Sequence, residues 1–542
     1  MRRRLVLPAA LAVCGALMVA AAPLAADNAS RATTGGTLRV NYSLSDFGYL
    51  DPALAYDGPS WTLLYVTGAT LLSFADAPAP KGSTVVPDAA ESFPRVSRDG
   101  KTYTFTLRKG LRFSDGSPVT AAAFARALYR AVSPEQVSPG APFISDIVGY
   151  EAVSSGKAKS LSGVTARGRT LVIRLSRPRP TIISELALPF FQAVKPTMAI
   201  DPKGISVYPT AGPYRIASRE VGRSVVLERN RFYRGPRKVN LDRIVVTVNT
   251  DTDASYLQVR AGQADYDLGG IPPTSHASLA EQYGVHRNGS FRYFVNPTLA
   301  VTYIALNTAR PFFANVAARK AVNWAIDRPA LLRVGGKFSG VRTDQILPTT
   351  MPGFKPVRLY PVKGADPAAA KKIAPSLDGE ITLLHTTSAT SVARAQVIKY
   401  NLEQLGIKVK LDARPFAVAL KTAETRGADF DMFLATWGAD YPDPSNFINP
   451  LFDGGTIRET NNTNFSYLNN AAFNKRMRAA AQLTGDARYA AYGQLDVDLM
   501  RSLAPWIPIS NPNVREFVSA RTRNYVFQPV FQAPNLALLS VR

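Results

Sequence analysis

The stretch Thr102–Arg126, TYTFTLRKGLRFSDGSPVTAAAFAR, combines a predicted strand, a turn and a helix in immediate succession. Tyr103, Phe105 and Leu107 alternate with polar residues, which is the period-2 pattern of a half-buried strand. The turn is predicted at 114–116, Ser-Asp-Gly, because Ser and Asp side chains bond the backbone and Gly tolerates positive φ.

The helix predicted after this turn has Thr120 as its N-cap and Phe124, Leu128 and Val132 near helical spacing. Strands and helices keep alternating through the second half of the chain, as expected of an α/β domain. Further strands are predicted at 38–42, 171–175, 303–307, 381–384, 407–411 and 432–435, and further helices at 257–262, 316–332, 392–405 and 489–503.

The start of the chain has the layout of a secretory signal peptide. Arg2, Arg3 and Arg4 precede a largely apolar run at 5–26, with no acidic residue before Asp27. Cleavage is expected after residue 26 or 32, although the run is long enough that an uncleaved membrane anchor stays open. The sequence therefore predicts a protein secreted across the cytoplasmic membrane, periplasmic or at the cell surface.

Cys14 is the only cysteine, and it lies inside this leader. The surrounding residues 11–15, LAVCG, loosely resemble a lipoprotein box, but Val13 is large for the position before a lipidated cysteine. Lipidation therefore stays open as an alternative to cleavage. In either case no disulfide framework is available, and a large apolar core must stabilise the fold.

The formal net charge is +24, and it stays at about +21 without the three leader arginines. The basic residues are scattered, with no run of five or more and no nucleic-acid motif. We therefore expect a solvated basic surface and no nucleic-acid partner. Attraction to an anionic cell envelope is a second interpretation of the charge.

The stretch at 102–126 strongly resembles the signature of family 5 solute-binding proteins, the peptide, dipeptide and nickel receptors of ABC importers. Other blocks resemble that family in the same order along the chain: 50–52 (LDP), 210–216 (TAGPYRI), 225–230 (VVLERN), 257–267 (LQVRAGQADYD), 316–332 (VAARKAVNWAIDRPALL) and 505–508 (PWIP). The resemblance covers nearly all of the chain after the leader.

The resemblance implies an α/β, two-lobed, periplasmic-binding-protein-like (type II) fold with an extra inserted domain and a discontinuous first lobe. We expect a signal peptide at 1–26, lobe I from 36–56, 187–290 and 503–542, the inserted domain at 57–186, and lobe II at 291–502. Length alone also indicates more than one domain.

The sharpest candidate site is the segment 436–447, TWGADYPDPSNF, directly after a predicted buried strand. Open α/β sheets bind ligands at the C-terminal ends of such strands. Trp437 offers a flat apolar face, Gly438 lets a ligand backbone approach closely, and Asp440 is a carboxylate for a positive group. Asp443 and Pro444 are expected only to shape the loop.

The same segment resembles a family motif whose acid holds the peptide α-ammonium group, so the resemblance gives that role to Asp440. Its predicted ligand-binding residues are Trp437, Gly438, Ala439, Asp440 and Tyr441. Some relatives hold the peptide carboxylate with an arginine three residues before the tryptophan, where this chain has Leu434. Others use a histidine in the region 388–393, which His385 and Arg394 flank out of register. Recognition of a peptide's C-terminus therefore stays open.

Motifs for other chemistry are missing from the sequence. It has no GxxxxGK[ST] phosphate loop, no HExxH and no GxSxG. The histidines, His276, His286 and His385, are far apart, so we expect no metal site and no cofactor, although nickel receptors exist in the family and His385 stays open as a contact. Asp440 and Asp443 lie on one short loop, which does not favour a glycosidase pair.

These observations predict a receptor and not an enzyme. It would bind a peptide or other small solute between its lobes as a monomer, and deliver it to an ABC permease driven by cytoplasmic ATPases. Two alternatives remain at this stage: a secreted hydrolase with an Asp or Ser site, and a binding protein that feeds a sensor instead of a transporter.

Overall fold

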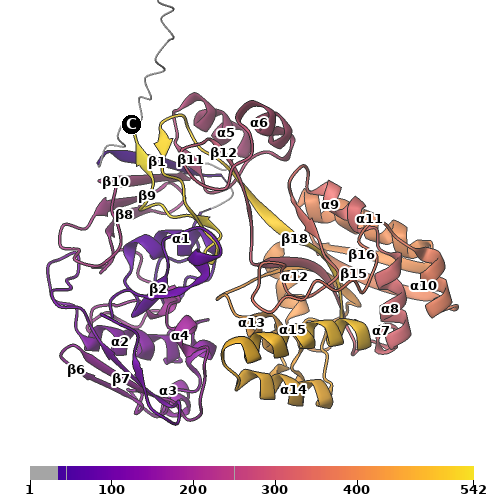
Figure 1. Ribbon diagram of the computed structural model, residues 1–542, viewed down its shortest axis with the longest axis horizontal. Helices are drawn as coiled ribbons and strands as arrows, with labels where there is room; N and C mark the ends of the chain where they lie inside the picture. Colours follow the sequence, from indigo (N-terminus) through magenta and orange to yellow (C-terminus); the bar gives the residue numbers. More distant parts are fainter. Residues whose placement is uncertain (1–34, 44–45, 249–250) are drawn as a thin grey trace, which may run out of the picture. The chain divides into compact units, whose positions relative to one another are not determined.

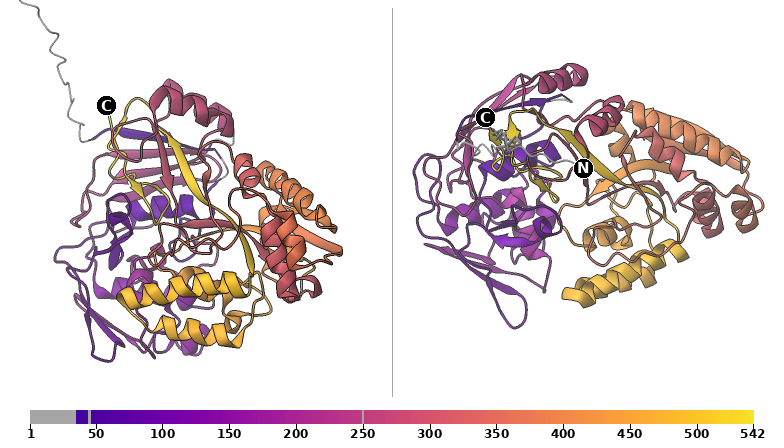
Figure 2. Two further views of the ribbon diagram at one scale, coloured as in Figure 1. Left: turned by 45° about the vertical axis from the view of Figure 1, so that its right-hand side comes forward. Right: turned by 45° about the horizontal axis from the view of Figure 1, so that its top comes forward.

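The computed structural model describes residues 35–43, 46–248 and 251–542, all within one compact unit. The predicted signal peptide 1–26, both predicted cleavage sites and Cys14 lie outside the described residues. Within the described ranges the strands form a five-stranded, a seven-stranded and a four-stranded sheet, with three two-stranded ribbons. Figure 1 and Figure 2 show these sheets and the helices around them.

The opening stretch folds as its pattern predicts. Strand β5 (Thr102–Thr106) is followed by a turn in which Asp115 Oδ1 accepts a backbone N–H at 3.0 Å and Gly116 has φ +85°. Helix α2 (Ala121–Val132) then begins after Thr120, whose backbone is extended as an N-cap requires, although its side chain makes no capping hydrogen bond. The apolar side chains predicted to share one helix face are buried.

The four-stranded sheet contains β5 and one face of it is covered by α2 (Figure 1). The order is β4 (Arg95–Val96), β5, β7 (Thr170–Arg174) and β6 (Val164–Arg167), with every pair antiparallel. Tyr103 and Phe105 are buried in the core, and Leu171 and Ile173 of β7 are buried in the same alternating way, so the period-2 pattern holds along these two central strands.

The five-stranded sheet joins the start of the described chain to much later segments. Its order is β11 (Tyr266–Asp267), β1 (Thr37–Tyr42), β10 (Arg243–Val248), β9 (Ser224–Arg229) and β8 (Tyr214–Glu220). Strand β1 pairs in parallel with both β10 and β11. Before β8, a Cβ on Gly212 would lie 2.4 Å from the carbonyl oxygen of Gly68, so only glycine permits this close backbone approach.

The seven-stranded sheet carries the second half of the chain. Its strands are β12 (Tyr293–Pro297), β18 (Trp506–Phe517), β13 (Ala300–Leu306), β17 (Met432–Gly438), β15 (Gly379–Thr386) and β16 (Ile407–Arg414), with β14 (Gly340–Arg342) also paired to β18. The long strand β18 pairs with β13 in its first half and with β12 in its second half. Figure 1 shows β18 as the yellow strand that connects these regions.

Helices cover both faces of this sheet. One face carries α8 (Val316–Ala325), α9 (Arg328–Val334), α10 (Pro367–Ile373) and α11 (Ala389–Glu403), and the other carries α12 (Phe416–Ala423), α13 (Ser445–Phe452), α14 (Ala471–Ala481) and α15 (Gly485–Ser502). Met432 and Leu434 pack into the first layer and Phe433 into the second, so β17 is buried on both faces as predicted.

One predicted helix is wrong, because the single helix expected at 316–332 is two helices, α8 and α9. The break lies before Pro329, because a proline ring clashes with the carbonyl four residues earlier, here that of Ala325, the last residue of α8. The side chain of Asp327 accepts a hydrogen bond from Ala330 N at 2.9 Å and starts the second helix as its N-cap. Ile326, which lies between the two helices, has an extended backbone and is buried.

The remaining elements are short and lie mainly in the first half and at the C-terminus. They are α1 (Gly58–Thr67), β2 (Leu72–Phe74), β3 (Val85–Pro87), α3 (Tyr150–Ser154), α4 (Ile182–Glu185), α5 (Thr252–Ala261), α6 (His276–Tyr283), α7 (Pro311–Ala314), β19 (Thr522–Arg523), β20 (Phe527–Gln528), β21 (Ala533–Pro534) and β22 (Ser540–Val541). In the part of the chain that the structure describes, no helix combines the length and the apolar character that a bilayer crossing needs. The predicted domain boundaries stay a prediction.

Candidate functional site

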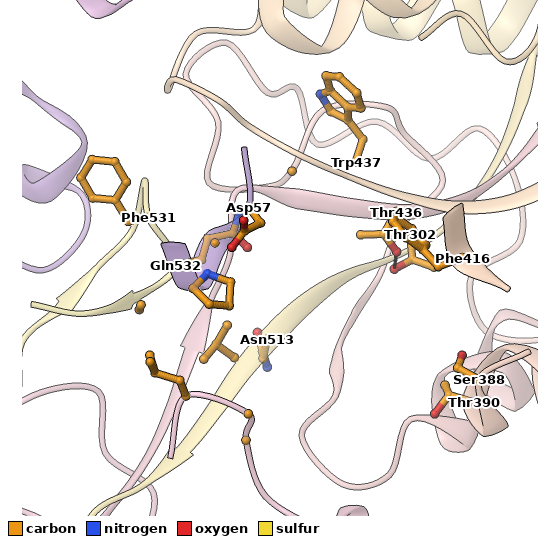
Figure 3. Close-up of a pocket in the computed structure, with 18 of the residues that line it drawn as sticks. Asp57, Thr302, Ser388, Thr390, Phe416, Thr436, Trp437, Asn513, Phe531 and Gln532 are labelled. Atoms are coloured by element: carbon orange, nitrogen blue, oxygen red, sulfur yellow. Dashed lines mark hydrogen bonds between the residues drawn. The ribbon is translucent and has the colours of Figure 1, made fainter. Parts of the chain in front are cut away.

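A cavity of about 940 Å³ collects segments from distant parts of the chain. Its lining comes from the start of α1, the segment after β11, the first turn of α11, the end of β17, the middle of β18 and the turn between β20 and β21. Figure 3 shows Asp57, Gln532 and Phe531 on one side of the pocket, and Ser388 and Thr390 on the other. The volume lies within the range of sites for small molecules and short peptides.

The end of β17 forms one wall of this cavity. Thr436 is exposed and its hydroxyl bonds that of Thr302 at 3.0 Å (Figure 3). Trp437 is half-buried against the helix layer of α12–α15, and its Nε1 is buried without a hydrogen-bond partner among the described residues. Gly438 leaves room for the side chain of Gln532 in the cavity wall, because a Cβ at position 438 would lie 3.0 Å from Nε2 of Gln532. Ala439, buried at 5% exposure, also lines the cavity.

Asp440 is buried at the cavity wall, with 8% of its surface exposed. The Tyr56 hydroxyl donates to Oδ1 at 2.7 Å and Asn446 Nδ2 donates to Oδ2 at 2.8 Å. In the described ranges no lysine, arginine or histidine forms an ion pair with it. Burial raises the pKa of Asp440, and the two hydrogen bonds only partly oppose this rise. A desolvated carboxylate without a cation is the group that a ligand ammonium would stabilise.

Tyr441, the last of the predicted binding residues, does not line the cavity. Its ring is buried in the core cluster of the first half of the chain, where it meets Phe143 edge-on at a centroid distance of 6.4 Å. Burial and the nearby Glu185 carboxylate raise the pKa of Tyr441 well above its ordinary value. Tyr441 and the Tyr56–Asp440 hydrogen bond thus tie the loop after β17 to the first half of the chain.

Asp443 is fully engaged in an ion pair. Arg488, on α15, donates from Nε and Nη2 to its two carboxylate oxygens at 2.9 and 2.8 Å. Its Oδ1 also accepts from Ser445 N at 2.9 Å, at the start of α13, where Pro444 is the preceding residue. These contacts support the loop-shaping role expected of Asp443 and Pro444, and they leave Asp440 as the uncompensated acid of the loop.

Two arginines form a positive end of the cavity. Arg394, on α11, and Arg515, on β18, both line it, and within the described residues neither has an ion pair. Arg515 donates to the carbonyls of Gly335 and Lys337, at 2.9 and 3.0 Å. Burial and the charge of Arg515 lower the pKa of Arg394. Leu434, where some relatives place an arginine, is apolar, 7% exposed and part of the same wall.

The three histidines have structural surroundings. His276 is buried, bonds the Tyr293 hydroxyl at 3.1 Å, and has a pKa lowered to about 4 by burial and then by Arg515. His286 stacks on Phe291 at 3.6 Å. His385 is buried and bonds its neighbour's carbonyl at 2.9 Å. Only His276 lines the cavity, and across the described ranges no group of three or more His, Cys, Asp or Glu could hold a metal ion.

Comparison with solved structures defines the class of the fold. The clavulanic acid biosynthesis oligopeptide binding protein 2 superposes with a TM-score of 0.85 at 24% identity, covering 94% of this chain and 96% of that chain. The Escherichia coli murein tripeptide binding protein MppA gives 0.76 at 24% identity, covering 94% and 99%. The chain therefore has the two-lobed α/β fold of type II periplasmic binding proteins, as predicted.

Sequence comparison places the chain within that class. Residues 84–459 match the profile described as bacterial extracellular solute-binding proteins, family 5 middle. The oligopeptide-binding protein OppA of Bacillus subtilis is 27% identical over 437 residues, 76% of either chain, and the glutathione-binding protein GsiB of Escherichia coli is 27% identical over 449 residues, 80% of this chain and 81% of that protein. The chain belongs to the family 5 extracellular solute-binding proteins.

Several cavity residues were not predicted from the sequence. Tyr56 and Asp57 come shortly after the LDP block at 50–52, but nothing in their spacing links them to a segment 384 residues later. Arg515 and Gln532 belong to the C-terminal tail, for which no ligand role was expected. No sequence pattern marks Gln532 as a cavity residue. In the structure it is distinguished by its backbone angle φ of +54°, which is uncommon outside glycine.

Proposed function

We propose that this chain is the extracytoplasmic receptor of an ABC importer and that it binds a peptide or peptide-like solute in the cavity. The observation that carries the proposal is Asp440, a buried carboxylate without a cation, in the wall of a cavity of about 940 Å³. Several relatives are named for oligopeptides or glutathione, and the Haemophilus influenzae OppA structure holds the peptide RPPGFSPFR. These ligands share an α-ammonium and a carboxylate.

The α-ammonium group binds Asp440 in this proposal. Inside a desolvated wall the attraction between carboxylate and ammonium exceeds its value in water. Tyr56 and Asn446 hold the carboxylate in place, one on each oxygen, so that it is oriented before the solute arrives. Each oxygen keeps further lone pairs for the ammonium hydrogens.

The solute carboxylate binds at the other end, between Arg394 and Arg515. Two uncompensated guanidinium groups repel each other and favour an anion between them. The first turn of α11 adds the Ser388 and Thr390 side chains on the same side of the cavity. Main-chain groups at the end of β17 hold the peptide backbone, so the side chains of the solute vary.

Closure of the two lobes on the solute follows from these contacts. A ligand stabilises a closed form only through interactions that the open form lacks. Asp440 and Arg394 lie in the second half of the chain, while Tyr56 and Asp57 lie in the first, so a bound solute contacts both. The closed form then docks as a monomer on a permease driven by cytoplasmic ATPases, without cofactor or catalysis.

Peptide titration tests the proposal. Calorimetry compares free and N-acetylated trialanine on the wild type and on Asp440→Ala. We expect the free peptide to bind the wild type and to lose at least a hundredfold in affinity on the variant, while the weaker acetylated peptide changes little. Equal losses for both peptides would remove Asp440 from the role, and peptide turnover by the wild type would favour the hydrolase alternative.

A further inference from the structure

A second carboxylate faces the cavity on the side of the first lobe. Asp57 is the N-cap of α1, where its Oδ1 accepts the backbone N–H of Ser60 at 2.8 Å. The residue is exposed, its Oδ2 accepts no hydrogen bond from the described residues, and no ion pair joins it to them. Oδ1 of Asp57 therefore caps the helix, and Oδ2 is available to a ligand.

Gln532 lines the same pocket as Asp57 and is drawn on the same side of it in Figure 3. It adopts φ +54°, a conformation that is costly for residues other than glycine and that recurs at functional sites. Its side-chain amide is half-buried against Gly438 and has no hydrogen-bond partner within the described ranges. The turn between β20 and β21 packs against α1, because the ring of Phe531 contacts that of Tyr65 with the centroids 4.4 Å apart.

Charge is distributed unevenly around the cavity of this basic chain. Asp57 and Asp440 lie toward the start of α1, while Arg394 and Arg515 lie at α11 and β18. Asp267 and Glu516 also line the cavity, but Asp267 accepts from the Ser255 hydroxyl and two backbone N–H groups, and Glu516 accepts from two tyrosine hydroxyls. Asp57 and Asp440, which lack a cation partner, together exceed what one α-ammonium group needs. The complementary solute therefore carries a second positive charge near its amino end and a negative charge at the other end.

We propose that Asp57 and Gln532 form a subsite for a cationic side chain, that of a lysine, ornithine or arginine in the first two residues of the solute. This inference rests on the proposed function, and it names the solute class. The side-chain cation binds the open Oδ2 of Asp57 and the amide oxygen of Gln532. Asp57 directly follows Tyr56, whose hydroxyl bonds Asp440, so the two acidic groups receive the two cations of one residue or of neighbouring residues.

Norleucine is the matched probe, because it keeps the four-carbon side chain of lysine and lacks only the terminal ammonium group. Calorimetry measures Lys-Ala-Ala against norleucine-Ala-Ala, and Ala-Lys-Ala against Ala-norleucine-Ala, on the full chain. We expect lysine to be preferred about tenfold in at least one pair, and Asp57→Asn to abolish the preference while the norleucine peptides keep their affinity. Asparagine preserves the cap of α1, since it is an equally good N-cap.

Two further variants separate the subsite from general charge effects. Asp366→Asn removes the same charge from another N-cap, which accepts Ala369 N at 2.8 Å and does not line the cavity, so the lysine preference persists. Gln532→Met keeps the side-chain length without the amide, and lowers the preference about twofold to threefold.

Three other results of these titrations would each contradict one element of the proposal. Equal affinity of lysine and norleucine peptides for the wild type in both pairs overturns this subsite and leaves the proposed function intact. A preference that survives in Asp57→Asn overturns the assignment to Asp57. Failure of all four peptides to bind the wild type overturns the proposed function, and this inference with it.

Discussion

Asp440→Asn should raise the free energy of unfolding and weaken peptide binding at the same time. The asparagine keeps both hydrogen bonds, because its oxygen accepts from Asn446 and its amide donates to the oxygen of the Tyr56 hydroxyl. It removes a charge that is buried without a cation, and we expect a gain of about 1–2 kcal/mol in the free energy of unfolding at pH 7.

The sign of this gain depends on pH. Burial raises the pKa of Asp440 in the folded state above its unfolded value, so the wild type is stabilised by this group below the unfolded pKa of about 3.9 and loses that stabilisation as pH rises through the folded pKa. The variant does not titrate at this position. Its advantage over the wild type is therefore small at pH 4 and largest at neutral pH.

Binding changes in the opposite direction. Truncating one partner of a buried charge pair costs about 2–5 kcal/mol, which corresponds to roughly a thirtyfold to several-thousandfold loss of affinity for a free-amine peptide. Urea unfolding at pH 4 and pH 7, followed by tryptophan fluorescence, measures stability, and calorimetry with trialanine measures affinity.

The control is Asp443→Asn on the same loop. It leaves Arg488, whose side chain is 4% exposed, without its carboxylate, and should destabilise by about 3–5 kcal/mol. If Asp440→Asn instead destabilises the protein by more than about 1 kcal/mol at pH 7 and peptide affinity is kept, Asp440 shapes the loop and the reasoning is refuted.

Three further predictions concern the same cavity. Glutamine in place of Arg394 or Arg515 should weaken free-acid peptides about tenfold and leave C-terminally amidated peptides nearly unchanged, as calorimetry would show; equal losses would contradict a carboxylate role. Burial raises the pKa of Glu516 to about 7, although two tyrosine hydroxyls donate to it. The wild type should therefore lose stability relative to Glu516→Gln as pH rises from about 4 to 8. If the urea midpoints of the two proteins differ by the same amount at pH 5 and at pH 8, this titration is excluded. Gly438→Ala puts a Cβ 3.0 Å from the movable side-chain amide of Gln532, at a position without positive φ. The free energy of unfolding should therefore change by less than about 1 kcal/mol, while peptide affinity falls several-fold. Unchanged peptide affinity in calorimetry would place the solute elsewhere.

Local elements were predictable because short-range patterns determine them. The strand at 102–106 follows from alternation, and the helix predicted to end at residue 262 has Gly262 as its C-cap, with φ +75°. The break between α8 and α9 was missed because the block was treated as one helix, although Asp327 and Pro329 are start signals for a second one.

The candidate site was predictable only in part. The segment after β17 was identified from its residues and its resemblance to the family, and Asp440 is buried at the cavity wall. The Tyr56 hydroxyl that reaches it, and Gln532 beside Gly438, depend on tertiary contacts between segments far apart along the chain. Periodicity and spacing carry no information about such contacts.

The last part of the chain completes both halves of the folded structure. Strand β18 completes the seven-stranded sheet, and the residues after it contact the first half, where Arg521 pairs with Asp265 at 3.3 Å and Asn240 donates to the Leu538 carbonyl at 2.7 Å. Neither half of the fold can make all of these contacts until synthesis of the chain is almost complete. A chain synthesised from its amino end therefore lacks, until its last residues are added, contacts that both halves of the folded structure contain.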